Sequence, residues 1–357
     1  MKKLVLSKIH ESLGGKMVEF SGYYMPVQYE GVKAEHNTVR TSVGVFDVSH
    51  MGQVFVSGVK ALDFLQYITS NDVSKLTPGR VQYTCLPNYK GGIVDDFLLY
   101  MISEDNYLLV VNASNIEKDI AWLKKHNTFE CTIDNQSDNY SLLAVQGPNS
   151  IDLLQELTNI KLSDISYYNF KIGIIAEIDN VILSRTGYTG EIGFELYVKN
   201  NNVRKLWDAI FSTSVPLKPI GLAARDTLRL EKGFCLYGND INEDTSPIEA
   251  GLGWITKFSK EFINYKQLKH QKLNGTNQVL VGIEIIEKGI ARKDYPVLNK
   301  NGNVIGKITS GTMSPTLNKS IALAYILSEY KALDSVVFIG IRNKQIKAIV
   351  TSLPFVK

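Results

Sequence analysis

Apolar residues along this chain recur with two different periods, which predict an alternation of helices and strands. A spacing of three to four residues is typical of a helix with one buried face, and alternation is typical of a half-buried strand. The first pattern predicts helices over 4–13, 32–43, 61–68, 116–126, 202–211 and 221–231, and a further helix after Gly147-Pro148. The second predicts strands over 16–20, 51–57, 81–86, 93–101, 107–111, 129–133, 141–146, 171–177, 181–184 and 196–198, whereas 45–48 is a short apolar stretch without an assigned element. Asn115 precedes the helix over 116–126 and is a candidate N-cap.

The order of these elements predicts an α+β fold with antiparallel sheets, and the length of 357 residues predicts two or three domains. Residues 51–137 run strand, helix, three strands, helix, strand, which is similar to a split β-α-β unit and predicts a ferredoxin-like α+β module with an antiparallel sheet. The polar segment 134–139 marks its boundary. Residues 246–357 start with a lead-in segment and continue as short strands separated by turn residues, which predicts a C-terminal all-β domain.

The segment 91–96, Gly-Gly-Ile-Val-Asp-Asp, carries the least expected polar residues of the chain. Two glycines make a turn, and two adjacent carboxylates then enter a strand that is otherwise apolar. Neighbours in a strand point to opposite faces, so Asp96 shares its face with Tyr100, whereas Asp95 shares its face with Phe97. Burying a carboxylate is costly unless it is paired or faces a wet cavity. We therefore expect at least one of these aspartates to have a specific function.

Composition and charge place the 357-residue chain among ordinary globular proteins, with 44% hydrophobic and 21% charged residues. A net charge of +3 does not argue for nucleic-acid binding, although it suits a moderately anionic ligand or an acidic partner. The 18 tyrosines fit pockets for flat ligands, but Tyr-rich β-structure is the favoured explanation on composition alone.

The three cysteines, Cys85, Cys131 and Cys235, form no C-x-x-C or zinc spacing, so we expect reduced, mostly buried thiols in a reducing compartment. The N-terminus has only three consecutive apolar residues, and no apolar run approaches the roughly 20 that span a membrane. We expect a cytoplasmic protein without membrane association.

Glycines at 187, 190 and 193 form the second unusual stretch. They lie between two predicted strands, whereas a dinucleotide-binding loop lies between a strand and a helix, so nucleotide binding is not expected. A glycine-rich hairpin is the simpler interpretation. The alternative is a loop that lets Tyr188 approach a ligand.

Glu195 follows this stretch, and alternation places it on the face of Tyr197. A carboxylate can accept two parallel hydrogen bonds from an amidine-like edge, such as the 2-amino-pyrimidinone edge of a pterin. A solvated glutamate on a strand is the competing interpretation.

Arg225 and Arg229 lie one helical turn apart, with Asp226 between them. A surface salt-bridge face is the usual explanation for such a pattern. The functional alternative is an arginine fork that binds a carboxylate, including Asp96 itself.

Several chemistries have no motif in this sequence. The five histidines show no metal-ligand spacing, so we predict no metal site. Neither G-x-S-x-G nor a P-loop is present, and nothing in the sequence activates Cys85 as a nucleophile. Carboxylates, tyrosines and arginines around a flat polar ligand remain as the candidate chemistry.

Taken together, the motifs closely resemble the T-protein family of the glycine cleavage system, the aminomethyltransferases. The matching stretches occur in order over nearly the whole chain: 15–18, 46–52, 91–96, 110–113, 146–148, 184–196, 221–230, 290–293 and 309–317. The resemblance implies a three-domain cloverleaf: a discontinuous α+β folate-binding domain of residues 1–50 and 138–245, the ferredoxin-like module 51–137 inserted into it, and a C-terminal barrel or jelly-roll-like domain within 246–357. It implies tetrahydrofolate as co-substrate without a metal. It also implies a lipoylated H-protein as partner, whose lipoyl arm carries an aminomethyl group that yields 5,10-methylene-tetrahydrofolate and ammonia.

The resemblance also assigns roles to individual residues. Asp96 corresponds to the family's key catalytic aspartate. Glu195 and Arg225 correspond to its folate-contacting carboxylate and arginine. Four further positions correspond to residues that line the folate cavity: Tyr83, Tyr100, Asn112 and Tyr188.

Other functions remain as alternatives. A folate-dependent demethylase of the same family would act without H-protein, and a folate-binding accessory protein would bind folate but release no ammonia. The presence of both Asp96 and Arg225 argues against the accessory protein. A plain β-rich interaction module would leave the buried aspartates unexplained.

Overall fold

The computed structural model describes residues 1–357 and divides by its internal contacts into two compact units. Unit 1 consists of Met1–Leu65, Val73–Tyr83 and Phe97–Asp226. Unit 2 consists of Gln66–Asp72, Thr84–Asp96 and Thr227–Lys357. Because the chain passes between the units several times, some helices and strands begin in one unit and end in the other.

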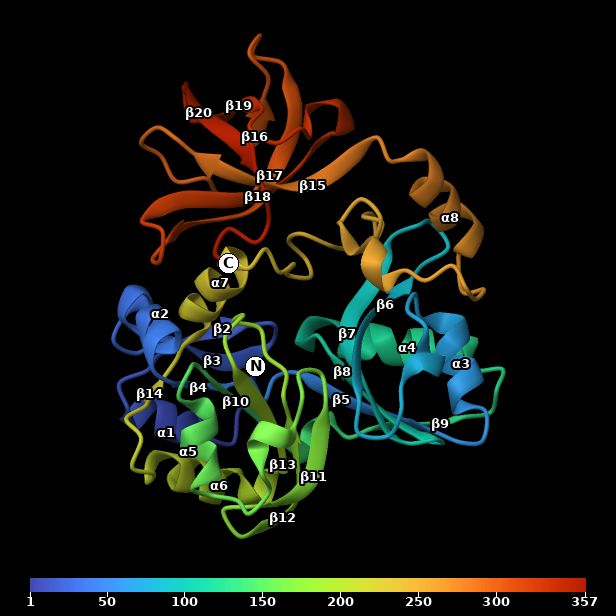
Figure 1. Cartoon of the computed structure of the whole chain (residues 1–357), viewed down its shortest axis with the longest axis vertical. Helices are drawn as coiled ribbons and strands as arrows, with labels where there is room; N and C mark the ends of the chain where they lie inside the picture. The colour runs from blue at the N-terminus through green and yellow to red at the C-terminus, as the bar shows by residue number, and fades with distance from the viewer. The chain divides into compact units, whose positions relative to one another are not determined.

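Eight α-helices are present (Figure 1): α1 Ser7–Ser12, α2 Val32–Thr41, α3 Ala61–Ile68, α4 Ile116–His126, α5 Ser150–Gln155, α6 Val203–Phe211, α7 Leu222–Glu231 and α8 Tyr265–Asn274. The sequence predicted all of them except α8, in which Leu268 is the only buried residue, so no apolar face marks it as a helix. Asn115 stands at the N-cap position of α4, as predicted, although its side chain makes no capping hydrogen bond.

A six-stranded sheet in unit 1 has the order β11-β12-β13-β10-β4-β14. Its strands are β4 Gly44–Asp47, β10 Tyr140–Gln146, β11 Phe170–Ile175, β12 Ile178–Ser184, β13 Gly193–Lys199 and β14 Lys218–Pro219. Apolar side chains of β10, β12 and β13 pack with those of α5 and α6, including the fully buried Phe194 and Leu206. This core fixes the register in which Ser184 pairs with Glu195.

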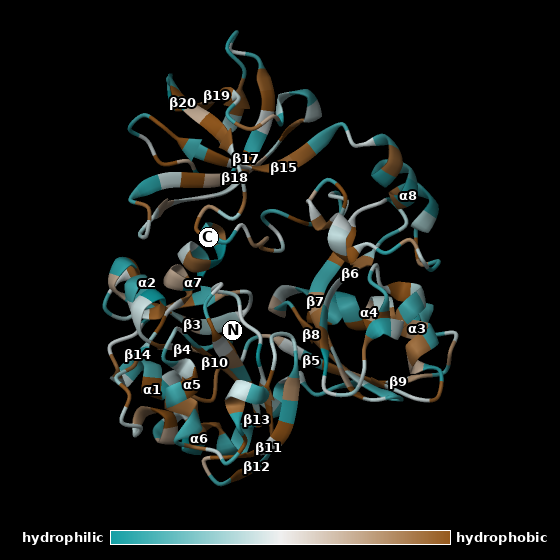
Figure 2. Ribbon diagram, in the orientation of Figure 1, coloured by the Kyte–Doolittle hydropathy of each residue, from teal (hydrophilic) through white to brown (hydrophobic).

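A five-stranded sheet has the order β6-β7-β8-β5-β9. Its strands are β5 Gly52–Ser57, β6 Val81–Pro87, β7 Ile93–Ser103, β8 Asn106–Val111 and β9 Thr132–Asn135. All these strands lie within the predicted inserted module. Figure 2 shows β8 largely in the hydrophobic colour and the polar helix α2 largely in the hydrophilic one. A small sheet, β1-β3-β2, contains β1 Lys2–Lys3, β2 Lys16–Phe20 and β3 Tyr23–Gln28, of which only β2 was predicted.

The C-terminal part of unit 2 forms a closed barrel of order β15-β18-β17-β16-β19-β20. Its strands, in orange to red in Figure 1, are β15 Gln278–Ile285, β16 Pro296–Leu298, β17 Val304–Ser314, β18 Lys319–Leu327, β19 Val336–Ile341 and β20 Lys344–Thr351. Alternate residues such as Ile283, Ala324 and Val350 fill the barrel interior. The α+β class and the C-terminal barrel are therefore confirmed. No helix has the length and apolar character needed to cross a membrane.

Candidate functional site

Glu195 lies on β13 in unit 1 and is only 7% exposed. The Thr186 hydroxyl donates a hydrogen bond to Glu195 Oε2 at 2.5 Å. Burial raises the pKa of the Glu195 carboxyl, whereas the Thr186 hydrogen bond, the Arg225 charge and a hydrogen bond from Tyr197 lower it. The interpretation as a solvated glutamate is wrong, because this carboxylate is buried and held by specific groups.

Three further hydroxyls extend the hydrogen bonding behind Glu195. The Tyr100 hydroxyl lies 2.8 Å from the Tyr197 hydroxyl and 3.0 Å from Ser184 Oγ, and Ser184 Oγ lies 2.9 Å from Thr186 Oγ1. Both tyrosine side chains are fully buried. The structure therefore gives Tyr100 a hydrogen-bonded place in the layer behind Glu195. Sequence reasoning missed Thr186 and Ser184, although their spacing of two before a strand is the signal that could have found them.

The glycine-rich loop before β13 folds around a glutamine side chain. Gln146 is buried, accepts a hydrogen bond from Thr189 Oγ1 at 2.9 Å, and donates one to the Thr186 carbonyl at 3.1 Å. A Cβ on Gly187 or Gly193 would overlap the Gln146 amide. These glycines are therefore required for close packing between two strands, and the hairpin interpretation is confirmed.

Arg225 is positioned by the start of α7. The buried Glu35 carboxylate accepts a hydrogen bond from the Gly221 N–H at 2.7 Å, and a Cβ on Gly221 would overlap the Val27 main chain. The guanidinium carbon of Arg225 lies 4.6 Å from the centre of the Tyr188 ring, within cation–π distance. Tyr188, Arg225 and Glu195 thus belong to one cluster, as the Arg225 charge also lowers the pKa of Glu195.

His50 is a further member of this region that sequence reasoning did not select. The imidazole is 4% exposed and meets the edges of Phe20 and Tyr23, and its Nδ1 has no hydrogen-bond partner. Burial and then the Arg225 charge lower its pKa to about 3, while Asp47 opposes the shift. His50 is therefore a neutral side chain near a cation.

Arg229 has a different environment from Arg225. It is 1% exposed, and its guanidinium donates to Asp240 Oδ2 at 2.8 Å and to Ser310 Oγ at 2.8 Å. Asp240 is also fully buried. The surface interpretation of the Arg225–Arg229 pattern is therefore wrong for Arg229, which is buried and holds the Asp240 carboxylate, whereas the fork interpretation stays a prediction for Arg225.

The two aspartates of β7 lie in unit 2. Asp95 is fully buried and Asp96 is half-buried, and Tyr100 on the face of Asp96 is also fully buried, so both faces of the strand are largely buried. Burial raises the pKa of the Cys85 thiol to about 12, a shift that Ser70 opposes and that both aspartates reinforce. Cys85 is therefore not a thiolate nucleophile, and all three cysteines are free and buried, as predicted.

The start of β7 is held by main-chain contacts. The Ile93 N–H donates to the Asn242 carbonyl at 2.9 Å, and the Tyr237 hydroxyl donates to the Ile93 carbonyl at 2.9 Å. The Asn88 side chain accepts from the Gly92 N–H and donates to the Glu243 carbonyl. A Cβ on Gly92 would overlap that Glu243 carbonyl oxygen. The Gly-Gly pair thus lets the segment 242–244 lie directly against the strand that carries Asp96.

Two further residues were predicted to line the folate cavity. Tyr83 is half-buried on β6, and Asn112 is half-buried directly after β8. Asn112 follows Val111, which pairs with Gly52, so it lies near the corner that contains His50. The roles of both residues stay predictions.

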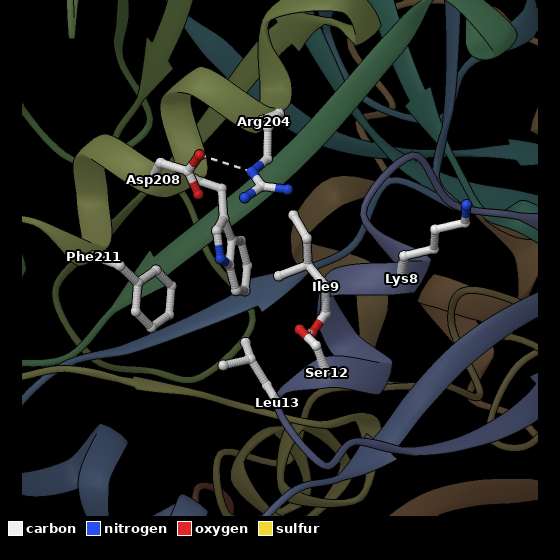
Figure 3. Close-up of a pocket in the computed structure, with 8 residues that line it drawn as sticks. Lys8, Ile9, Ser12, Leu13, Arg204, Asp208 and Phe211 are labelled. Atoms are coloured by element: carbon white, nitrogen blue, oxygen red, sulfur yellow. Dashed lines mark hydrogen bonds and ion pairs between the residues drawn. The ribbon is translucent and has the colours of Figure 1, made fainter.

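Figure 3 shows a surface groove between α1 and α6 of unit 1 with a volume of about 370 Å³. Trp207 and Phe211 line it beside the Arg204–Asp208 ion pair. None of the predicted site residues lines this groove. The structure also contains no cluster of three or more His, Cys, Asp or Glu side chains that could hold a metal ion.

The fold and the site define an α+β protein with a C-terminal barrel and a buried carboxylate near an arginine. The model of the GCVT N-terminal domain matches residues 6–260, and that of the glycine cleavage T-protein C-terminal barrel domain matches residues 278–357. The chain therefore belongs to the glycine cleavage T-protein family.

Full-length relatives agree with this assignment. The chain is 56% identical to an aminomethyltransferase of Flavobacterium psychrophilum and 54% identical to one of Bacteroides fragilis, in each case over 100% of both chains. It superposes with a TM-score of 0.94 and 35% identity on the crystal structure of glycine cleavage system aminomethyltransferase T from Bartonella henselae, covering 99% of this chain and 98% of that one.

Proposed function

We propose that this chain is the aminomethyltransferase of a glycine cleavage system. It transfers the methylene of an aminomethyl group, carried on the lipoyl arm of H-protein, to tetrahydrofolate. In this reaction the carbon loses its bonds to ammonia and to the lipoyl sulfur and gains bonds to two folate nitrogens. The products are 5,10-methylene-tetrahydrofolate, ammonia and the reduced lipoyl arm.

The observation that carries the proposal is the buried Glu195 carboxylate. Thr186 donates a hydrogen bond to it, and the positive charge of Arg225 lowers its pKa. The pterin ring of tetrahydrofolate presents two parallel N–H groups that a carboxylate binds in a bidentate manner. A hydrogen bond between a carboxylate and a neutral donor is about 1.5–3 kcal/mol in strength, so one such residue can orient the ring. Arg225, stacked on Tyr188, supplies a fixed cation for an anionic part of the ligand.

Asp96 supplies the second part of the mechanism. Loss of ammonia from a sulfur-linked aminomethyl group develops iminium-like positive charge on the carbon. A fixed carboxylate stabilises that charge and orients the attacking amine without a metal or a covalent enzyme intermediate. Asp96 suits this function because it is half-buried on a strand whose start is fixed by the contacts at Gly92 and Ile93.

Ammonia release from aminomethyl-loaded H-protein tests the proposal, measured with and without tetrahydrofolate. We expect release that tetrahydrofolate accelerates, with 5,10-methylene-tetrahydrofolate formed in equal amount. Folate binding without ammonia release would identify an accessory protein instead. Transfer from methylated donors that needs no H-protein would identify a demethylase.

A further inference from the structure

Four hydroxyl groups connect to the Glu195 carboxylate in a continuous hydrogen-bonded network within unit 1. Thr186 Oγ1 contacts Glu195 Oε2 directly at 2.5 Å, and Tyr197 also hydrogen-bonds to the carboxylate. Behind them, Ser184 Oγ lies 2.9 Å from Thr186 and the Tyr100 hydroxyl lies 2.8 Å from Tyr197. All four side chains are at most 2% exposed, so water does not compete for these hydrogen bonds.

The donor inventory fixes the direction of these hydrogen bonds. An ionised carboxylate only accepts, and each hydroxyl has a single proton to donate. Thr186 and Tyr197 therefore donate to ionised Glu195, and each can then only accept from the hydroxyl behind it. Ser184 has one proton for Thr186 or Tyr100, and Tyr100 has one proton for Tyr197, Ser184 or Thr186. The shortest of these contacts, Ser184–Thr186 at 2.9 Å and Tyr100–Tyr197 at 2.8 Å, favour donation from Ser184 to Thr186 and from Tyr100 to Tyr197. Both branches direct their protons toward Glu195, and such chains strengthen each hydrogen bond within them.

Protonation of Glu195 disturbs this order. A protonated carboxyl has a proton to donate, but the hydroxyls around it already donate toward it. At least one hydroxyl must then reorient to accept that proton. The network therefore stabilises the ionised form and opposes the effect of burial, which favours the neutral form. The same hydroxyls also fix the orientation of the carboxylate, because they reach it from β13 and from the segment after β12.

We propose that Thr186 and Tyr197 are positioning residues that keep Glu195 ionised and oriented for the pterin ring, supported by Ser184 and Tyr100. The proposal rests on the proposed function, since it assumes that Glu195 binds tetrahydrofolate. It also gives Tyr100 a role through Tyr197 rather than a direct contact with the ligand.

Calorimetric titration with tetrahydrofolate between pH 5.5 and 8 tests this role. For Thr186→Val we expect affinity at pH 7 to fall roughly 10-fold, the scale of a lost hydrogen bond to a charged group. For Tyr197→Phe we expect a roughly 5-fold loss, and for Ser184→Ala, one step removed, less than about 3-fold. The hydroxyls lower the pKa of Glu195, so their loss raises it, and the acid limb of the affinity profile moves to higher pH.

Matched variants separate positioning from packing. Thr186→Ser restores the hydroxyl and should recover most of the affinity and the original acid limb. Tyr107→Phe removes another buried tyrosine hydroxyl of unit 1, which donates to the Glu104 carbonyl at 3.2 Å, and should leave both unchanged. In a Glu195→Gln background the Thr186→Val effect should largely disappear, because the group that it serves is gone.

The outcomes also separate this proposal from the proposed function. Wild-type protein that fails to bind tetrahydrofolate overturns the proposed function and the positioning role together. Wild-type protein that binds, with unchanged affinity and acid limb in folded Thr186→Val and Tyr197→Phe, overturns the positioning role alone. If Thr186→Val does not fold, the variants Thr186→Ser and Tyr197→Phe test the positioning role. A loss of affinity in Tyr197→Phe without a shift of the acid limb would contradict the proposal.

Discussion

The carboxylates Glu195 and Asp96 are held in contrasting ways. Glu195 in unit 1 is nearly inaccessible and is held by side-chain hydroxyls, which act on its charge and its orientation. Asp96 in unit 2 is half-buried, and it is the main chain of its strand that is fixed, by Asn88, Tyr237 and the segment 242–244. A carboxylate that binds a part of the ligand that does not react benefits from staying ionised in one orientation. For Asp96 we propose contact with the reacting group, and the contacts at Gly92 and Ile93 fix the backbone that carries it.

The largest expected effect is on stability and concerns a third carboxylate, Asp240. We assign it no role in ligand binding. Asp240→Ala leaves the Arg229 charge buried without its partner, and we expect a loss of about 3–5 kcal/mol in the free energy of unfolding. Urea denaturation measures it. Lys307→Ala, which breaks an exposed pair with Asp294, is the control and should cost less than about 1 kcal/mol. Similar losses in both variants would show that the Arg229–Asp240 pair is not structurally important.

Asp96→Asn tests the reacting carboxylate. We expect turnover to fall by about 10²-fold or more, because a group that stabilises developing charge is lost. Folding and tetrahydrofolate affinity should be nearly unchanged, since the amide has the same shape. Steady-state ammonia release and calorimetry on the same samples measure both quantities. Wild-type turnover would mean that Asp96 is structural.

Glu195→Ala tests the binding carboxylate. Tetrahydrofolate affinity should fall by roughly 1–3 kcal/mol, the cost of a lost charged hydrogen bond. Turnover at saturating tetrahydrofolate should fall far less than in Asp96→Asn, so the two variants separate binding from reaction. Unchanged affinity by calorimetry would remove Glu195 from the site.

The contrast was partly visible in the sequence. Strand alternation alone separated Asp95 from Asp96 and placed Glu195 with Tyr197, because those relations depend only on local geometry. The partners of Arg229 could not be predicted, since Asp240 and Ser310 reach it from a loop and from the barrel. The reason for Gly187 is likewise a distant glutamine, Gln146. Contacts between segments far apart in the chain leave no periodic signal.

Gly92→Ala tests whether the backbone contacts at the start of β7 position Asp96. The new Cβ meets the Glu243 carbonyl, which is main chain and cannot rotate away, so the strand must shift. Because small displacements of a reacting group are costly, we expect turnover to fall roughly 10-fold while tetrahydrofolate affinity holds. Gly253→Ala is the matched control, because its Cβ would meet only the flexible end of Lys272 at 3.0 Å. Equal turnover in the two variants would contradict the positioning role.

The smallest expected effect is on the pH dependence of stability and concerns His50, which lies near Arg225. Its pKa is lowered from 6.5 to about 3, so the folded protein keeps the imidazole neutral while the unfolded chain protonates it below about pH 6.5. The unfolded state then binds more protons, and stability must fall as the pH falls through this window. Between pH 6.5 and 5.5 we expect His50 to contribute a loss of about 1 kcal/mol, which His50→Gln should abolish. Urea denaturation at both pH values measures the difference, and parallel pH dependence in wild type and variant would show that the buried imidazole is not kept neutral.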